Sequence, residues 1–166
     1  DVCFYSDSHY HESGRPQINL GVKGLCYVEI TLREAETDLH SMMATCIQNP
    51  AWRMVKLLNT MRDAEGNITI DGFYDDVRPL NQLEIDAVSK IPSDNEVLKK
   101  QYGVDHFIKG RKSDNFYYNL IVEPTCNIAG ISSGFTGNGS KTVLPREAVV
   151  KIDMRLVPGQ TPDKIY

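Results

Sequence analysis

Three residues of this chain carry side chains whose type and position could do chemistry: His40, Arg155 and Asp7. His40 lies in a loop of small and apolar residues. A histidine held there by Asp38 and Ser41, just ahead of a helix, could handle a proton or bind an oxyanion, because an imidazole ordinarily titrates near neutrality. A loop histidine without a task is the alternative, and the loop by itself does not exclude it.

The two charged candidates stand at the ends of predicted strands. Arg155 is on the outward side of the stretch 147–156. Its guanidinium fork would suit a substrate carboxylate, although a solvated arginine paired with Asp153 is the other interpretation. Asp7 follows the apolar run 1–5, which is typical of a buried strand, and a carboxylate at the C-terminal end of a strand is a common site residue in α/β sheets.

Two other motifs resemble ligand sites but are better explained otherwise. His9 and His11 could share one side of an extended segment and bind a metal, yet a solvated loop is favoured. The glycine-rich stretch 130–142 resembles a phosphate loop, which needs a lysine directly after the last glycine and a helix starting there. Here Ser140 precedes Lys141 and the following residues favour extended chain, so we expect no nucleotide site.

Strands are predicted by alternation of apolar and polar residues, which is clearest at 21–33 and 147–156. The inward residues are Cys26, Val28, Ile30 and Leu32 on the first strand and Ala148, Val150, Ile152, Met154 and Leu156 on the second. One buried and one wet face is typical of an antiparallel sheet. Shorter strands are expected at 68–70 and 125–131, whereas 117–122 fits a strand or a helix.

Helices are predicted by caps and by apolar residues at steps of three and four. The strongest spans 50–62, with Asn49 as N-cap and a proline at the first position, where the missing N–H costs nothing. Its apolar stripe would be Ala51, Met54, Val55, Leu58 and Met61. The charged segment 81–102 is expected to form two short helices divided by Pro92, and another helix begins after Thr161.

This order of elements predicts an α+β fold: a two-layer ferredoxin-like sandwich, β-α-β-β-α-β, with an antiparallel sheet and helices on one face. An uncovered sheet edge can pair two copies. The formal charge of -4 and the pI near 5.5 argue against nucleic acid as a partner. No apolar run approaches the roughly 20 residues of a membrane span, so we expect no membrane association.

The cysteines and the chain ends give two further expectations. Cys3, Cys26, Cys46 and Cys126 fall in no metal-ligand spacing, which favours reduced structural thiols in a cytoplasmic protein. Because the chain opens at Asp1 rather than at a methionine and closes on a helix just begun, we expect a piece of a longer protein.

Six stretches, taken together and in order, carry a resemblance. They are Gly24-Leu25, Asp38-Leu39-His40-Ser41, Asn49-Pro50, Gly72-Phe73-Tyr74-Asp75-Asp76-Val77-Arg78-Pro79-Leu80, Gly139-Ser140-Lys141-Thr142-Val143-Leu144-Pro145 and Met154-Arg155-Leu156-Val157-Pro158-Gly159-Gln160. They resemble the lid, or dimerisation, domain of the di-zinc metallopeptidases, a family that includes aminoacylases, carboxypeptidase G, succinyl-diaminopimelate desuccinylases and carnosinase-like dipeptidases. The stretches 72–80 and 155–158 point most to the dipeptidase branch. The resemblance implies a lid domain at 9–166, with 1–8 as the last strand of the first half of a catalytic domain.

The resemblance also implies roles for the three candidate residues. His40 matches the lid histidine that reaches across the dimer into the partner's active site and steadies the oxyanion of the tetrahedral intermediate. Arg155 matches the arginine that binds the substrate's C-terminal carboxylate in dipeptidase-like members, and Asp7 matches an aspartate that ligates one of two zinc ions. The implied partners are a peptide or N-acyl amino acid substrate and a second subunit, joined as a homodimer through the lid.

The chain departs from the family's complete pattern. The H-x-D ligand pair, the paired glutamates and the downstream histidine are absent from it, so we expect an active full-length parent but an inactive piece. The family usually places Ser-Gly after the histidine, whereas Met42 follows Ser41 here. A catalytically silent ferredoxin-like module for association or ligand sensing is the alternative, in which His40 and Arg155 are incidental.

Overall fold

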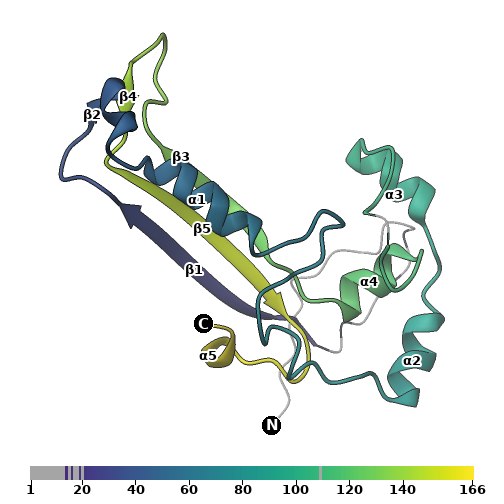
Figure 1. The fold of residues 1–166 in the computed structure, drawn as a ribbon. Helices are drawn as coiled ribbons and strands as arrows, with labels where there is room; N and C mark the ends of the chain where they lie inside the picture. Colours follow the sequence, from purple (N-terminus) through teal and green to yellow (C-terminus); the bar gives the residue numbers. More distant parts are fainter. Residues whose placement is uncertain (1–13, 15, 17–18, 20, 109) are drawn as a thin grey trace.

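The computed structural model describes residues 14, 16, 19, 21–108 and 110–166. The main sheet of the described residues has three antiparallel strands in the order β1-β5-β3: β1 (Gly24–Arg33), β5 (Glu147–Leu156) and β3 (Asn127–Ser133) (Figure 1). A second sheet pairs β2 (Leu39–His40) with β4 (Val143–Leu144). With α1 packed on the main sheet, the predicted α+β fold is confirmed.

The two long strands pair over their whole length, from Gly24 opposite Leu156 to Arg33 opposite Glu147. All five residues predicted to point inward from β5 are buried, whereas the opposite face is more open. A β-bulge interrupts β3 between Ile128 and Gly130. The alternation in the sequence therefore gave the correct faces, and the pairing leaves β1 and β3 as the two edges of the described sheet.

Helix α1 (Pro50–Asn59) begins as the sequence predicted and ends earlier. The Asn49 side chain accepts the N–H of Ala51 at 2.8 Å and so caps the helix. The helix ends at Asn59 rather than near residue 62, because the Thr60 N–H turns back to the Leu57 carbonyl at 3.0 Å. This tighter bond replaces the next α-helical one.

The predicted apolar stripe of α1 is partly wrong. Met54 is buried and Leu57, outside the predicted stripe, packs against the core. Val55, which belonged to the stripe, is 49% exposed, and Trp52 is 69% exposed. The helix contacts β5 and β1 through its inner side. Its outer side therefore keeps apolar surface that the described residues leave uncovered.

Three helices lie together beyond the C-terminal end of β5: α2 (Gln82–Ser89), α3 (Asn95–Tyr102) and α4 (Phe116–Val122) (Figure 1). Pro92 separates α2 from α3 as predicted. The segment 117–122, which fitted a strand or a helix, is helical, and the Asn115 side chain accepts an N–H at its start. The helical excursion is thus set apart from α1.

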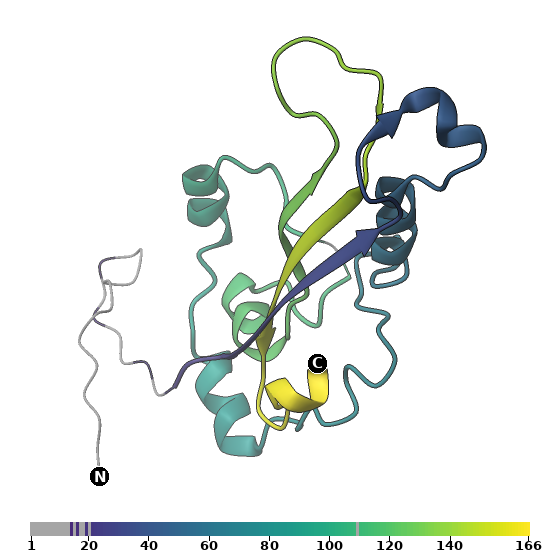
Figure 2. The same ribbon diagram turned by 90° about the vertical axis from the view of Figure 1, so that its left-hand side faces the viewer.

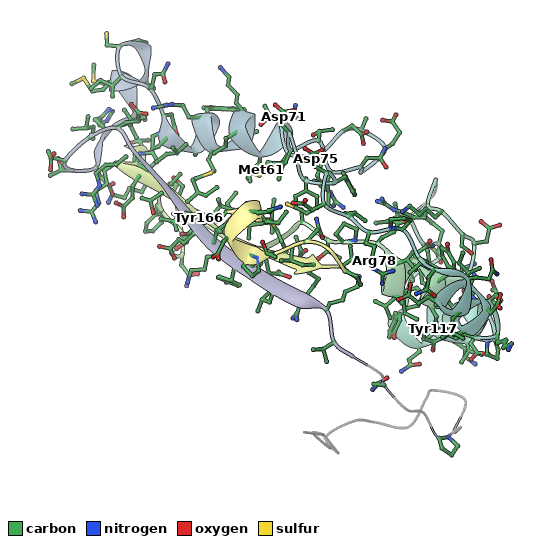
Figure 3. The ribbon with its side chains drawn as sticks, turned by 90° about the horizontal axis from the view of Figure 1, so that it is seen from below. Met61, Asp71, Asp75, Arg78, Tyr117 and Tyr166 are labelled. Carbon is green, nitrogen blue, oxygen red and sulfur yellow. The ribbon has the colours of Figure 1, made fainter. Side chains whose placement is uncertain are left out.

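The segment 68–70, predicted as a strand, makes only the isolated bridge Arg62–Ile68, and that prediction is wrong. The chain turns again at 71–76 before a ladder can form. A groove of about 710 Å³ lies on this side of the sheet. Its lining includes Met61 and Asp71 as well as Tyr166, next to α5 (Pro162–Ile165) (Figure 3).

Several predictions fall on residues outside those described. These are the strand at 1–5, Asp7, the histidine pair and the domain boundary after residue 8. The last helix, α5, starts where predicted, although the Thr161 side chain makes no capping hydrogen bond. Within the described ranges no helix is long and apolar enough to cross a bilayer.

Candidate functional site

His40 lies at one end of the molecule, in a loop held by backbone pairing. The residue is paired with Val143 in the small β2-β4 sheet, and the Ser41 N–H donates to the Thr142 carbonyl at 3.3 Å. The glycine-rich loop 134–142 therefore lies beside the histidine (Figures 1 and 2). As predicted, this loop leads into extended chain, β4, rather than into a phosphate-binding helix.

The imidazole of His40 is exposed and oriented by its own backbone. Its Nδ1 accepts the Met42 N–H at 3.2 Å, at the start of η1 (Ser41–Thr45). A neutral imidazole that accepts at Nδ1 carries its proton on Nε2, so Nε2–H is available as a donor. The expected hold by Asp38 takes another form, because the Asp38 carboxylate accepts the Arg146 N–H at 3.0 Å and anchors the loop.

Arg155 lies on the open face of the sheet, opposite Leu25. Thr125 fixes its backbone from both sides: Thr125 Oγ1 accepts the Arg155 N–H at 3.0 Å, and the Thr125 N–H donates to the Arg155 carbonyl at 2.9 Å. Asp153 accepts the Asn127 side-chain amide at 2.8 Å instead of pairing with the arginine. In the part of the chain that the structure describes, no carboxylate forms an ion pair with Arg155.

Sequence reasoning missed a second cation at this end of the sheet, Lys23. Its ammonium donates to the carbonyl of Glu123, at the end of α4. Burial lowers the pKa of the Lys23 ammonium, the Glu123 carboxylate raises it, and the Arg155 guanidinium lowers it further. In the sequence, Lys23 is only a lysine near the start of a predicted strand. Its proximity to Arg155 depends on how β1 pairs with β5, which the sequence does not show.

Strand β2, which contains His40, and the C-terminal end of β5, which contains Arg155, lie at opposite ends of the main sheet (Figure 1). Arg155 is eight residue steps after Glu147 in β5, which is about 26 Å at about 3.3 Å a step. His40 pairs with Val143, beyond that first end of β5. Because an extended dipeptide spans only about 7 Å, one chain cannot present both side chains to one dipeptide.

The described residues form no metal centre. No group of three or more histidine, cysteine, aspartate and glutamate side chains among them could hold an ion. Asp7, the predicted zinc ligand, lies outside the described residues. What this part of the chain offers chemically is therefore an imidazole hydrogen-bond donor at one end and a pair of cations at the other.

Known proteins share this fold and much of this sequence. Residues 20–166 match the peptidase dimerisation domain family. An M20 family metallo-carboxypeptidase from Sulfolobus solfataricus has a crystal structure that matches 95% of this chain and 41% of its own, with 43% identity and a TM-score of 0.87. Two curated dipeptidases match 99% of this chain and 34% of their own lengths at 29% identity: Beta-Ala-His dipeptidase of Rattus norvegicus and Cys-Gly metallodipeptidase dug1 of Schizosaccharomyces pombe.

The chain spans about a third of the length of these curated relatives. The matches confirm the resemblance seen in the six sequence stretches, and they agree with the α+β fold. The chain belongs to the peptidase dimerisation domain family of the M20 metallopeptidases.

Proposed function

We propose that this chain is the lid and dimerisation domain of a zinc-dependent dipeptidase or related amidohydrolase, and that it supplies His40 and Arg155 to active sites completed by the rest of the enzyme. The observation that carries the proposal is that His40 and Arg155 lie beyond and near opposite ends of β5, whose span from Glu147 to Arg155 is about 26 Å. Two groups so far apart serve two different sites. Each site therefore takes Arg155 from one subunit and His40 from the other.

The two side chains have complementary tasks in this proposal. Arg155, whose guanidinium has no carboxylate partner among the described residues, binds the C-terminal carboxylate of a peptide or N-acyl amino acid. His40 donates Nε2–H to the oxyanion that develops at the scissile carbonyl. A donor of this kind is worth roughly 3–4 kcal/mol of transition-state stabilisation.

The metal belongs to parts of the enzyme other than the described residues. Two zinc ions would polarise the carbonyl and generate the nucleophile, with Asp7 as one ligand in the strand 1–8, ahead of the lid at 9–166. We also place the enzyme in the cytoplasm. Free thiols at the buried Cys26 and Cys126 support a reducing compartment.

The dimer contact is proposed at the outer edge of β3. Ile128 and Ile131 on this strand are 49% and 59% exposed. They pair with buried residues of β5, so they point to the side of the sheet that carries α1. Trp52 and Val55 add exposed apolar surface on α1 itself.

A second copy fits this surface best. An edge strand presents unpaired backbone groups, and two identical edges can pair about a two-fold axis. The apolar side chains that flank β3 would then pack against their own copies. The match to a dimerisation domain family supports a copy of the same chain as the partner.

The roles of the two site residues can be tested separately in the full-length enzyme. His40→Ala should lower kcat about 100- to 1000-fold without unfolding the protein, measured by steady-state kinetics and thermal unfolding. Arg155→Gln should chiefly raise KM for a dipeptide with a free carboxylate and should affect its C-terminal amide much less. Normal turnover of the His40→Ala enzyme would instead favour the catalytically silent module.

The dimer surface has its own test. Ile131→Lys places a charge in the apolar contact and should convert the dimer to monomer in sedimentation velocity. Thr31→Lys on β1, the other edge strand, is the matched control and should leave the dimer intact. If Thr31→Lys dissociates the dimer and Ile131→Lys does not, the contact lies at β1 and the assignment to β3 is wrong.

A further inference from the structure

Lys23 and Arg155 lie on the same open face of the main sheet. Leu25 is opposite Arg155 in the β1-β5 ladder. Lys23 is two residues before Leu25, and side chains two residues apart in extended chain point to the same side. Lys23 is therefore a diagonal neighbour of Arg155, a placement that the electrostatic effect of the guanidinium on the ammonium supports.

One short segment, 123–125, contacts the Lys23 ammonium and the backbone of Arg155. The Glu123 carbonyl accepts the Lys23 ammonium. Two residues later, Thr125 binds the Arg155 backbone through its hydroxyl and its N–H. A single stretch of chain after α4 therefore fixes the Lys23 ammonium and the backbone from which the Arg155 side chain extends.

The positive charges of Lys23 and Arg155 are not fully neutralised by the neighbouring carboxylates. The Glu123 carboxylate, whose charge raises the pKa of the Lys23 ammonium, is 3.5 Å from the Arg111 guanidinium and also accepts the Lys112 N–H. Asp153, on the same face as Arg155, accepts the Asn127 amide. The two carboxylates are thus already engaged, and a half-buried Lys23 and an exposed Arg155 remain as cations on one face of the sheet.

We propose that Lys23 is a specificity-determining residue that binds the substrate's terminal carboxylate together with Arg155. This inference rests on the proposed function of the lid and adds a second cation to its carboxylate site. The guanidinium provides a planar fork and the ammonium a compact point charge, so the two can bind different lone pairs of one carboxylate. Substrates without a free carboxylate would leave two like charges close together and unpaired.

The test uses the full-length enzyme and the ratio of kcat/KM for a dipeptide to that for its C-terminal amide. Lys23→Gln keeps a donor for the Glu123 carbonyl but removes the charge, and it should lower this ratio roughly tenfold. Lys23→Arg keeps a cation and should restore most of the ratio. Lys151→Gln removes another exposed lysine from the same face, where it pairs with Glu29 at 3.7 Å, and is the matched control that should not change the ratio.

Each outcome separates this inference from the function on which it rests. If Arg155→Gln lowers the ratio and Lys23→Gln does not, Lys23 only caps α4 and the inference is overturned while the proposed function stands. An equal loss on dipeptide and amide after Lys23→Gln would also overturn it, since a structural defect acts on both. If Arg155→Gln leaves the ratio unchanged, the proposed carboxylate site itself is refuted.

Discussion

Mixed dimers offer a decisive test of how the two lid residues are shared. A heterodimer of one His40→Ala subunit and one Arg155→Gln subunit contains one site with both residues intact if each site draws them from different subunits. The other site then carries both defects. Because the two sites of a two-fold dimer are otherwise equivalent, the heterodimer should show about half of wild-type activity, although each parental homodimer should be at least roughly tenfold less active than wild type.

The magnitude follows from the separation of the two residues. They are separated by at least the length of β5 between Glu147 and Arg155, about 26 Å, so one chain cannot complete a dipeptide site alone. Each homodimer loses about 100- to 1000-fold for the missing oxyanion donor or at least roughly tenfold in kcat/KM for the missing cation. A heterodimer with about half of the wild-type activity is therefore clearly more active than either parental homodimer.

The assay needs heterodimers purified through two different affinity tags, with kcat/KM measured below saturation. The matched control joins one wild-type subunit to one subunit that carries both substitutions. This dimer contains the same four residues in the opposite arrangement, and both of its sites should be defective. Half activity in the control together with inactivity of the first heterodimer would refute the shared-site reasoning, because the two residues would then act within one chain.

Three further predictions concern the fold of this chain. Gly159→Ala should lower the unfolding free energy by at least about 2 kcal/mol in a urea titration. Gly159 has a φ of +99°, and a Cβ there would lie 1.9 Å from the Asp76 carbonyl oxygen. An unchanged midpoint of the titration would contradict this geometry. Met54→Ala should cost about 2–5 kcal/mol by the same measurement, since the side chain is 1% exposed, and a loss below about 1 kcal/mol would mean that the core refills the space. The Arg78 hydrogen bond lowers the pKa of Glu84. This carboxylate therefore stabilises the fold above its unfolded pKa, and the stabilisation is lost as the pH falls through its folded pKa. Glu84→Gln should flatten the dependence of the melting temperature on pH below about pH 5, and an unaltered dependence would contradict the linkage.

Local patterns in the sequence determined the long elements. Alternation over 147–156 assigned the buried face of β5 correctly, and the Asn49-Pro50 pair marked the start of α1. Both signals are local, because side-chain periodicity and capping hydrogen bonds involve residues only a few positions apart in the sequence. The same reasoning failed for 68–70, because a strand needs a partner that a short apolar alternation does not supply.

The side chains named as chemically competent, His40 and Arg155, were also found from the sequence, since residue type and motif are local properties. Their arrangement was not. Strand register placed Lys23 beside Arg155, and the β2-β4 pairing placed His40 at the other end of the sheet, beside the glycine-rich loop. Both depend on pairings between residues more than 100 positions apart in the chain, which local periodicity cannot specify. The sequence by itself thus determined which groups this chain carries, and only the tertiary structure decided that His40 and Arg155 lie at opposite ends of the sheet.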